Sequence, residues 1–273
     1  MTDRTWFSGE LETVATYWRV LRRDGIALGF TSHDRDLRFA GVLHLSAPGM
    51  VPSAIRRSIM VEPDSAEMQG ALDHAAIRSA DLAAGRFDGA AVSVGLVDWE
   101  SGEHFELFAG SIGAVGQDGA RFTAELLSAK TALDRELVPR TAPTCRAEFC
   151  GPGCTLSPPR FTRELWLAEL DPASNAARFD GLAEASPFAF GRLRWADGAE
   201  AGLDVAVLDT DGAWLFLDRA PAAGLAAGAR AIVREGCDHT LETCATRFAN
   251  AINFQGEPFL PGNDLLTRYA NPA

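Results

Sequence analysis

The sequence predicts a mainly β protein of the α+β class, with an N-terminal β-rich domain over residues 1–140 and a C-terminal β-rich domain over residues 141–273. Three observations predict this organisation. Short runs rich in valine and aromatic residues alternate with Asp-Gly and other turn signals. A proline-containing stretch from Val138 to Pro143 stops regular structure between the two halves. All five cysteines lie in the second half, which predicts a cysteine-liganded domain with only short helices.

The N-terminal domain is expected to begin with a β-hairpin and to continue as an antiparallel meander. Residues 15–21 and 26–31 are strand-like runs on either side of Asp24-Gly25, a pair that accepts the positive φ of a tight turn. The same pattern predicts further strands over residues 36–39, 42–46, 89–99, 105–115 and 120–127. Helices are expected over residues 64–74, 80–85 and, with Ser128 as its cap, 128–136.

The C-terminal domain is expected to open with a cysteine loop and to continue with strands separated by Asp-Gly turns. These strands are predicted over residues 163–167, 188–194, 203–209, 213–217 and 229–234. Thr240 predicts the cap of a helix over residues 241–250, with Glu242 in the first turn, where the helix dipole favours an anion. Proline and glycine then predict an irregular tail over residues 253–264, either ordered or bound to a partner.

The composition is that of a globular protein, and its charge argues against a nucleic-acid-binding surface. Of the 273 residues 47% are hydrophobic and 23% are charged, and the formal net charge is −12. Phosphate binding needs clusters of lysine and arginine, whereas the 25 basic residues are scattered. The first residues contain no apolar signal segment and no run approaches eighteen apolar residues. We therefore expect synthesis in the cytoplasm and no stable membrane insertion.

No pattern typical of an enzyme stands out, so we expect no catalytic activity. Nucleophile-elbow, P-loop, dinucleotide-binding and His-Glu-x-x-His motifs do not occur in the sequence. His33, Asp34 and Asp36 are the best candidates for an acid–base cluster, but a solvated turn between strands explains them more simply.

The cysteines form two clusters far apart in sequence, an arrangement typical of a metal site. Cys145, Cys150 and Cys154 share one segment, and Cys237 and Cys244 share the other. Disulfides are rare in a reducing compartment and five is an odd number, so thiolate ligands are favoured over disulfide bridges. Soft thiolates select zinc, copper(I) or iron-sulfur clusters. The alternative is that the cysteines are small buried apolar side chains, which the neighbouring glycines and prolines disfavour.

The spacing favours an iron-sulfur cluster over a zinc ion. Eight residues separate Cys145 from Cys154 and six separate Cys237 from Cys244, whereas most structural zinc sites use knuckles with roughly two to four intervening residues. A cluster spreads its ligands over several iron atoms and therefore accommodates wider loops.

Two neighbouring side chains are placed outside the expected ligand set. His239, beside an aspartate, is interpreted as a surface residue or as a residue that supports the ligands. Cys150 has only Arg146 as a nearby positive charge, so a packing role is favoured over a reactive thiol.

Several motifs resemble the tail hub proteins of phages and of the phage-derived gene transfer agents of alphaproteobacteria. Cys-Arg-Ala-Glu-Phe-Cys-Gly-Pro-Gly-Cys lies at residues 145–154 and Gly-Cys-Asp-His at residues 236–239. A longer motif begins Cys-Ala-Thr-Arg-Phe and ends Pro-Phe-Leu-Pro-Gly, at residues 244–262. Residues 81–99 resemble a pattern of the same family. The resemblance covers nearly the whole chain.

This resemblance implies a structural role at a tail tip. Family members assemble as trimers between the distal tail ring and the central fibre or megatron-like protein, and lambda-type relatives carry a [4Fe-4S] cluster in the C-terminal domain. By position, the implied ligands are Cys145, Cys154, Cys237 and Cys244, although Cys150 could exchange places with Cys154. The expected protein is a homotrimeric virion component, stapled by its cluster and lining the DNA exit path. Its acidic charge would let DNA pass without binding, and exposed strand edges would accept partners by β-augmentation.

Two other functions stay open at this point. An iron-sulfur electron carrier or enzyme would lose its chemistry, but not particle assembly, when the cysteines are replaced. A zinc-stapled binding module would be colourless, whereas an iron-sulfur protein purified without air is brown.

Overall fold

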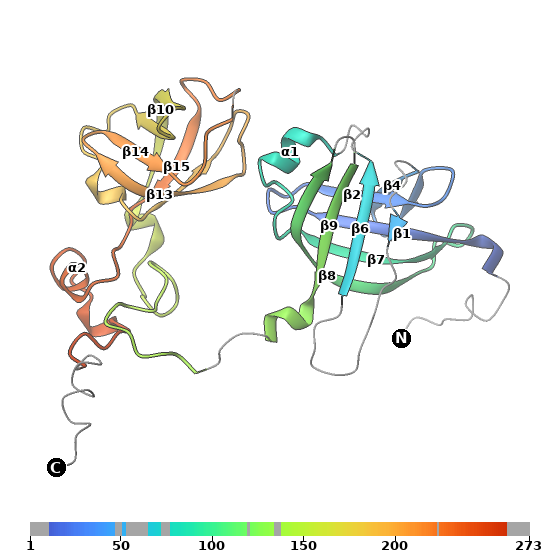
Figure 1. Cartoon of the computed structure of the whole chain (residues 1–273), viewed down its shortest axis with the longest axis horizontal. Coiled ribbons are helices and arrows are strands. Elements are labelled where there is room, and N and C mark those ends of the chain that lie inside the picture. Colours follow the sequence, from blue (N-terminus) through green and yellow to red (C-terminus); the bar gives the residue numbers. More distant parts are fainter. Residues whose placement is uncertain are drawn as a thin grey trace, which may run out of the picture. The chain divides into compact units, whose positions relative to one another are not determined.

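The computed structural model of this chain describes residues 11–46, 51–52, 65–71, 77–118, 121–133, 138–222 and 224–260. The chain divides into two compact units, Met1–Glu136 and Leu137–Ala273 (Figure 1). Both units are built from strands with a few short helices, so the predicted mainly β class is confirmed. None of the helices in the described ranges is long and apolar enough to cross a membrane.

The N-terminal unit contains a nine-stranded sheet in the order β3-β4-β2-β1-β7-β8-β9-β6-β5. Its strands are β1 (Val14–Leu21), β2 (Ala27–Thr31), β3 (Leu37–Phe39), β4 (Val42–Leu45), β5 (Val51–Pro52), β6 (Ser65–Ala71), β7 (Ala91–Asp98), β8 (His104–Asp118) and β9 (Arg121–Ser128). The unit also contains the helix α1 (Ser79–Ala83) and the 3-10 turns η2 (Leu11–Thr13) and η3 (Ala129–Leu133).

The predicted hairpin at the start of the sheet is confirmed, but the simple meander is wrong. β1 and β2 pair antiparallel, with Leu21 opposite Ala27, around a turn in which Gly25 has a φ of 88°. β4 then returns to pair parallel with β2. In this inner position its His44 is fully buried, and the three-residue β3 lies at the edge of the sheet.

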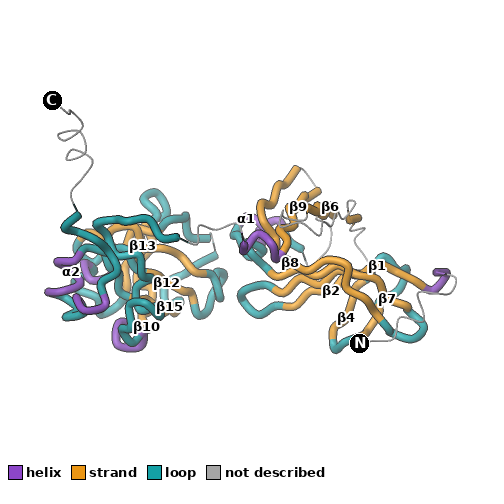
Figure 2. Tube along the Cα trace, turned by 90° about the horizontal axis from the view of Figure 1, so that it is seen from below, coloured by secondary structure: helices purple, strands orange, loops and turns teal. Residues whose placement is uncertain are grey.

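β8 is the strand that bends the sheet. It pairs first with β7 and then with β9, and its register with β9 shifts between Ile112 and Val115. A bulge of this kind increases the local twist and bends the strand, and the two views show β6, β8 and β9 curling over β1, β2 and β7 (Figures 1 and 2). The main core lies in this curl and includes Trp18, Val20, Phe30, Phe108, Phe122 and Leu126.

Two predicted helices of this unit are corrected by the structure. Residues expected as a helix over 64–74 include β6, which pairs with β9 from Ser65 opposite Leu127 to Ala71 opposite Arg121. The expectation is wrong because long-range pairing outweighs a weak local helix preference, and residues 64 and 72–74 lie outside the described ranges. The helix expected over 128–136 is only the η3 turn as far as residue 133, and residues 134–136 are likewise outside. The short helix expected over 80–85 is present as α1.

The C-terminal unit contains a closed six-stranded barrel in the order β10-β11-β14-β13-β12-β15. Its strands are β10 (Thr162–Asp171), β11 (Ala176–Phe179), β12 (Arg192–Trp195), β13 (Asp204–Asp211), β14 (Trp214–Leu217) and β15 (Arg230–Arg234). Two 3-10 turns, η4 (Pro158–Phe161) and η5 (Ser186–Phe188), flank the strands. The barrel is filled by apolar side chains that include Leu167, Phe179, Phe188, Leu193, Trp195 and Leu215.

Two strand predictions in the barrel are also corrected. β11 was not expected, because its alanines carry little strand preference, yet Ala176 and Ala177 are buried between β10 and β14. The strand expected over residues 188–194 starts only at Arg192. The residues before it form the 3-10 turn η5. Phe190 then follows with a φ of 62°, which is incompatible with a strand.

Candidate functional site

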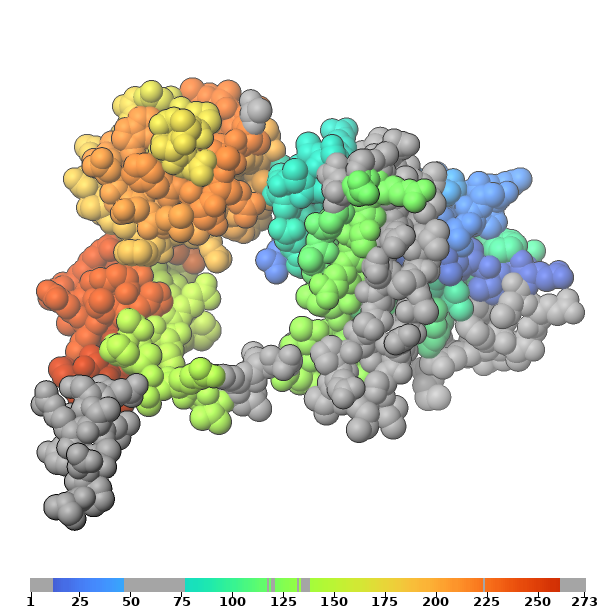
Figure 3. Space-filling view, viewed as in Figure 1, coloured from blue at the N-terminus to red at the C-terminus, as the bar shows by residue number. Residues whose placement is uncertain are grey.

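The two cysteine segments lie side by side, although 82 residues separate Cys154 from Cys237 in sequence (Figure 3). The Cys145 amide donates to the His239 carbonyl oxygen at 2.8 Å, and the Arg146 amide donates to the Gln255 carbonyl oxygen at 3.0 Å. The first segment leads into η4 and β10, and the second segment follows β15. β10 and β15 are paired antiparallel. The pairing of β10 with β15 therefore brings the two segments together.

An ion pair holds the tail to the start of the unit. The Arg146 guanidinium donates to Glu257 at 2.7 Å, and the Ala142 amide donates to the same carboxylate oxygen at 3.0 Å. The hydrogen bond from Arg146 is the main reason that the pKa of Glu257 is lowered. Both side chains are about one-third exposed, so this pair aligns the segments more than it stabilises them.

The cysteines expected to be ligands surround one cavity. Its lining contains all four of them, Cys145, Cys154, Cys237 and Cys244. His239, Thr240, Asn250 and Asn253 are among the other lining residues. The cavity has a volume of about 20 Å³, room for about one water molecule. Within the described ranges, no three His, Cys, Asp or Glu side chains form a group that could hold a metal ion.

Three of these four sulfurs accept N–H hydrogen bonds. The His239 amide contacts the Cys237 Sγ at 3.4 Å, and the Gln255 amide contacts the Cys145 Sγ at 3.3 Å. The Asn250 Nδ2 lies 3.7 Å from the third sulfur, the Cys154 Sγ. Donors aimed at sulfur favour the thiolate over the thiol, which is the form that binds metals.

The fourth sulfur is presented by the short helix α2 (Leu241–Thr246). The predicted cap is confirmed, because the Thr240 side chain accepts a hydrogen bond from the Thr243 amide at 3.2 Å. Asp238 supports the cap by accepting from the Thr240 amide at 2.9 Å and from the Thr243 hydroxyl at 2.8 Å. The helix ends at Thr246, earlier than the predicted residue 250, and its one buried residue is Cys244.

The electrostatics of the cavity suit a bound cation. Burial raises the pKa of the Cys237 and Cys244 thiols, and the neighbouring cysteines raise both further. Four adjacent thiolates in a partly buried cavity repel one another, and a soft metal cation would remove that repulsion. The chemistry of the four side chains, rather than their spacing around the cavity, therefore fits a thiolate-bound metal group.

Cys150 is not among the residues that line the cavity. Its backbone has a φ of 60°, and its charged neighbours include Arg234 and Glu235 at the end of β15. Burial, followed by the charge of Cys154, raises the pKa of the Cys150 thiol to about 11. A thiol in this state is protonated at neutral pH and a poor nucleophile.

The sequence did not reveal the residues that build the cavity walls. Phe149 and Phe248 line the cavity and lie 4.9 Å apart between ring centroids. Phe161 of η4 packs against both rings, which joins the cavity to the start of the barrel. His239, expected at the surface or as a supporting residue, lines the cavity, and its Nδ1 lies 3.0 Å from the Cys145 carbonyl oxygen.

The candidate acid–base residues lie in the turn between β2 and β3. His33 Nδ1 lies 3.2 Å from Asp34, whose side chain is 82% exposed. The Asp36 carboxylate accepts a hydrogen bond from the Ser46 amide at 2.8 Å, which ties the turn to the end of β4. These contacts are those of the solvated turn that the sequence favoured.

A buried polar pair in the N-terminal unit had no sequence signal. The Arg19 Nε lies 3.0 Å from the Nε2 of His44, whose ring stacks on Phe39 with centroids 3.9 Å apart. Burial and then the charge of Arg19 lower the pKa of His44 to about 4. His44 is therefore neutral at physiological pH, and its lone pair can accept the hydrogen bond from Arg19.

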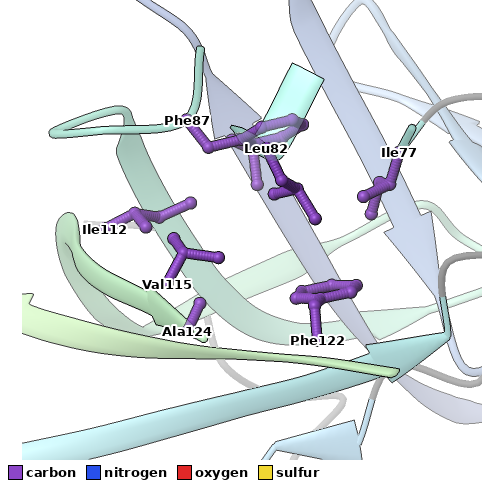
Figure 4. A pocket seen from close by; sticks show the side chains of 8 residues that line it. Ile77, Leu82, Phe87, Ile112, Val115, Phe122 and Ala124 are labelled. Atoms are coloured by element: carbon purple, nitrogen blue, oxygen red, sulfur yellow. The ribbon is translucent and has the colours of Figure 1, made fainter. Parts of the chain in front are cut away.

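A pocket in the described part of the N-terminal unit is apolar and has a volume of about 10 Å³. Leu82 of α1 and Phe87 cover it from one side, and Ile112, Val115 and Phe122 point into it from β8 and β9 (Figure 4). It carries no polar side chain to orient a ligand, so we regard it as part of the core.

Comparison with known proteins gives relatives for both halves of the chain. Residues 3–157 match the family described as baseplate hub protein, N-terminal attachment domain. Residues 186–264 match the family described as phage conserved hypothetical protein BR0599. A chain in the solved virion of a native gene transfer agent particle is 35% identical, over 99% of this chain and 95% of that chain, with a TM-score of 0.85. No curated protein matches the chain.

Proposed function

The chain belongs to the baseplate hub protein family, and we propose that it joins the distal tail ring to the central fibre or megatron-like protein of a phage-like particle. It is a structural component of the tail of such a particle. The observation that carries the proposal is the match of residues 3–157 to an attachment domain. The similarity to a virion chain over both units supports it.

Particle assembly tests this role. Cells that carry every other particle gene but lack this one should produce tails that end at the distal ring and carry no fibre. Supplying the full-length chain should restore the fibre. Tails that retain the fibre without this chain would contradict the proposal.

The proposal includes a homotrimer that surrounds the path of DNA. Its support is the family resemblance together with the net charge of −12, because an acidic lumen does not bind a passing polyanion. Electron microscopy of the assembled tail tip would count the copies and map the charge. A basic lumen, or a copy number other than three, would contradict this part.

The proposal also includes a [4Fe-4S] cluster held by Cys145, Cys154, Cys237 and Cys244. When bound, the cluster would supply a cationic core shared by thiolates of both segments. It would thereby join the segment that precedes the barrel in sequence to the segment that follows it. The support is that all four cysteines line one cavity and that N–H groups point at three of the sulfurs.

Metal and sulfide analysis of the full-length protein, purified without air, tests the cluster. Iron and inorganic sulfide in equal amounts are expected, and Cys237→Ser should abolish both. Cys150→Ser is the matched control and should retain them. Zinc without sulfide would support the zinc-stapled alternative, and a Cys237→Ser protein that still assembles tails but loses a redox activity would support the electron carrier or enzyme.

A further inference from the structure

Asn250 connects the two cysteine segments directly. It follows α2 and is only 6% exposed. Its backbone amide donates to the Cys244 carbonyl oxygen at 2.9 Å, and its side-chain Nδ2 donates to the Cys154 carbonyl oxygen at 2.7 Å. One buried residue therefore fixes a cysteine of each segment relative to the other.

The orientation of the Asn250 amide is determined by its neighbours. A carbonyl oxygen only accepts hydrogen bonds, so the atom that faces Cys154 at 2.7 Å must be the nitrogen. Asn250 Oδ1 is then free to accept from Asn253 Nδ2, which lies 2.7 Å away. In this orientation Nδ2 also points at the Cys154 Sγ, at 3.7 Å.

A second contact holds the loop just before Cys154. Gln255 Nε2 donates to the Gly153 carbonyl oxygen at 3.2 Å. A Cβ atom at Gly153 would lie 2.6 Å from this Nε2, so any other residue here would displace the Gln255 amide. Cys150 receives no comparable support, because among the described residues no hydrogen-bond donor contacts its sulfur, and it does not line the cavity.

Building on the thiolate-bound cluster proposed above, we propose that Asn250 is a positioning residue that selects Cys154, rather than Cys150, as the fourth ligand. It does so by holding the backbone and the sulfur of Cys154 toward the cavity while its own backbone holds Cys244. Replacing residues that support metal ligands lowers metal affinity by about 10- to 100-fold. A loss of this size is expected for Asn250→Ala.

The test compares ligand choice with and without Asn250, using iron and sulfide content of full-length protein after exposure to a chelator. With Asn250 present, Cys154→Ser should lose iron and Cys150→Ser should keep it. With Asn250→Ala, the affinity for iron should fall about 10- to 100-fold, and the iron content should now fall further when Cys150→Ser is added. Asn175→Asp, in the turn between β10 and β11, is the control for changing an asparagine elsewhere. Iron that still depends on Cys154 alone in the Asn250→Ala background would overturn the proposal.

A metal-free measurement separates this inference from the cluster itself. In apoprotein, Asn250→Ala should change the rate of Cys154 alkylation by iodoacetamide several-fold, because both the donor to its sulfur and the contact that holds its backbone are lost, and should leave Cys150 unchanged, as read by mass spectrometry. An equal change at both thiols, or no change at either, would overturn the proposal even if wild-type protein binds iron. Should Asn250→Ala fail to fold by circular dichroism, Asn253→Ala removes only the contact that orients the amide, and it should change Cys154 reactivity in the same direction. An unchanged rate there would count against the inference.

Discussion

The strongest electrostatic prediction concerns Asp24, in the turn between β1 and β2. Its carboxylate accepts hydrogen bonds from Arg22 Nε at 3.1 Å and from Arg86 Nη1 at 3.2 Å. The side chains of Arg22 and Asp24 are almost fully buried from solvent, at 4% and 8% exposed. Asp81 of α1 completes the group, 3.7 Å from Arg22 and 3.2 Å from Arg86. The four charges therefore fasten α1 to the hairpin turn.

We expect Asp24→Asn to destabilise the N-terminal unit by about 3 kcal/mol. Removing one partner of a buried ion pair costs about 3–5 kcal/mol, and the lower limit applies because Asp81 still faces both arginines. At roughly 4 °C per kcal/mol for a domain of this size, the melting temperature should fall by about 12 °C. Asparagine keeps the shape of the side chain, so packing changes little.

The pH dependence provides an internal check. Burial alone would raise the pKa of Asp24, but hydrogen bonds and charge from Arg22, supported by Arg86, outweigh it and the pKa is lowered. The carboxylate thus contributes stability above its ordinary pKa of 3.8, and this contribution is lost as the pH falls through the lowered value. The difference between wild type and Asp24→Asn should shrink over that acidic range.

The assay is denaturant unfolding combined with hydrogen exchange of the β1–β2 turn and α1. Asp34→Asn is the matched control, because its side chain is 82% exposed, and it should change stability by no more than about 0.5 kcal/mol. If Asp24→Asn is no more destabilising than this control at neutral pH, the four-charge group does not act as described.

Three further substitutions test the packing and capping described above. Gly95→Ala would push a Cβ into the Phe105 carbonyl oxygen and the Tyr17 ring. Denaturant unfolding should show that the free energy of unfolding falls by about 1–3 kcal/mol. The Gly116→Ala control should show no such loss, because the nearest atom would lie 4.0 Å from the new Cβ. Trp195→Ala empties the barrel core and should cost about 3–5 kcal/mol in thermal unfolding, and a cost no larger than that of Trp166→Ala, at a side chain 48% exposed, would argue against the assigned core. Asp238→Ala removes the support of the α2 cap and should cost about 1–2 kcal/mol; hydrogen exchange should be faster in α2 but not in the barrel, and uniform acceleration would contradict a local role.

The sequence predicted the strands whose signal is local. The hairpin around Asp24 and Gly25 was found because alternation and turn chemistry lie within a few residues of each other. The sequence of β6 favours a helix, and that of β11 carries no strand signal, because the strand character of both comes from pairing with other strands. The parallel contact of β4 with β2 likewise joins segments whose sequences carry no signal for that pairing.

The site was predictable only as far as its thiols. Cysteines within glycine- and proline-rich segments indicated which side chains would meet, and the structure places four of them around one cavity. The donors to sulfur could not be predicted, because two are backbone amides, of His239 and Gln255, and any residue carries such a group. Asn250 had no signal either, since its role depends on how the loops are juxtaposed.

The closed barrel of the C-terminal unit limits how that unit can recognise other proteins. Each of its six strands already has a neighbour on both sides, so none is free to extend a foreign sheet, and the β-augmentation considered from the sequence does not apply to the barrel. Recognition there must come from outward side chains such as Trp166 and Ile232, which are 48% and 42% exposed. Related particles could therefore change partners at this unit by substituting surface residues, without altering the hydrogen-bonded framework beneath.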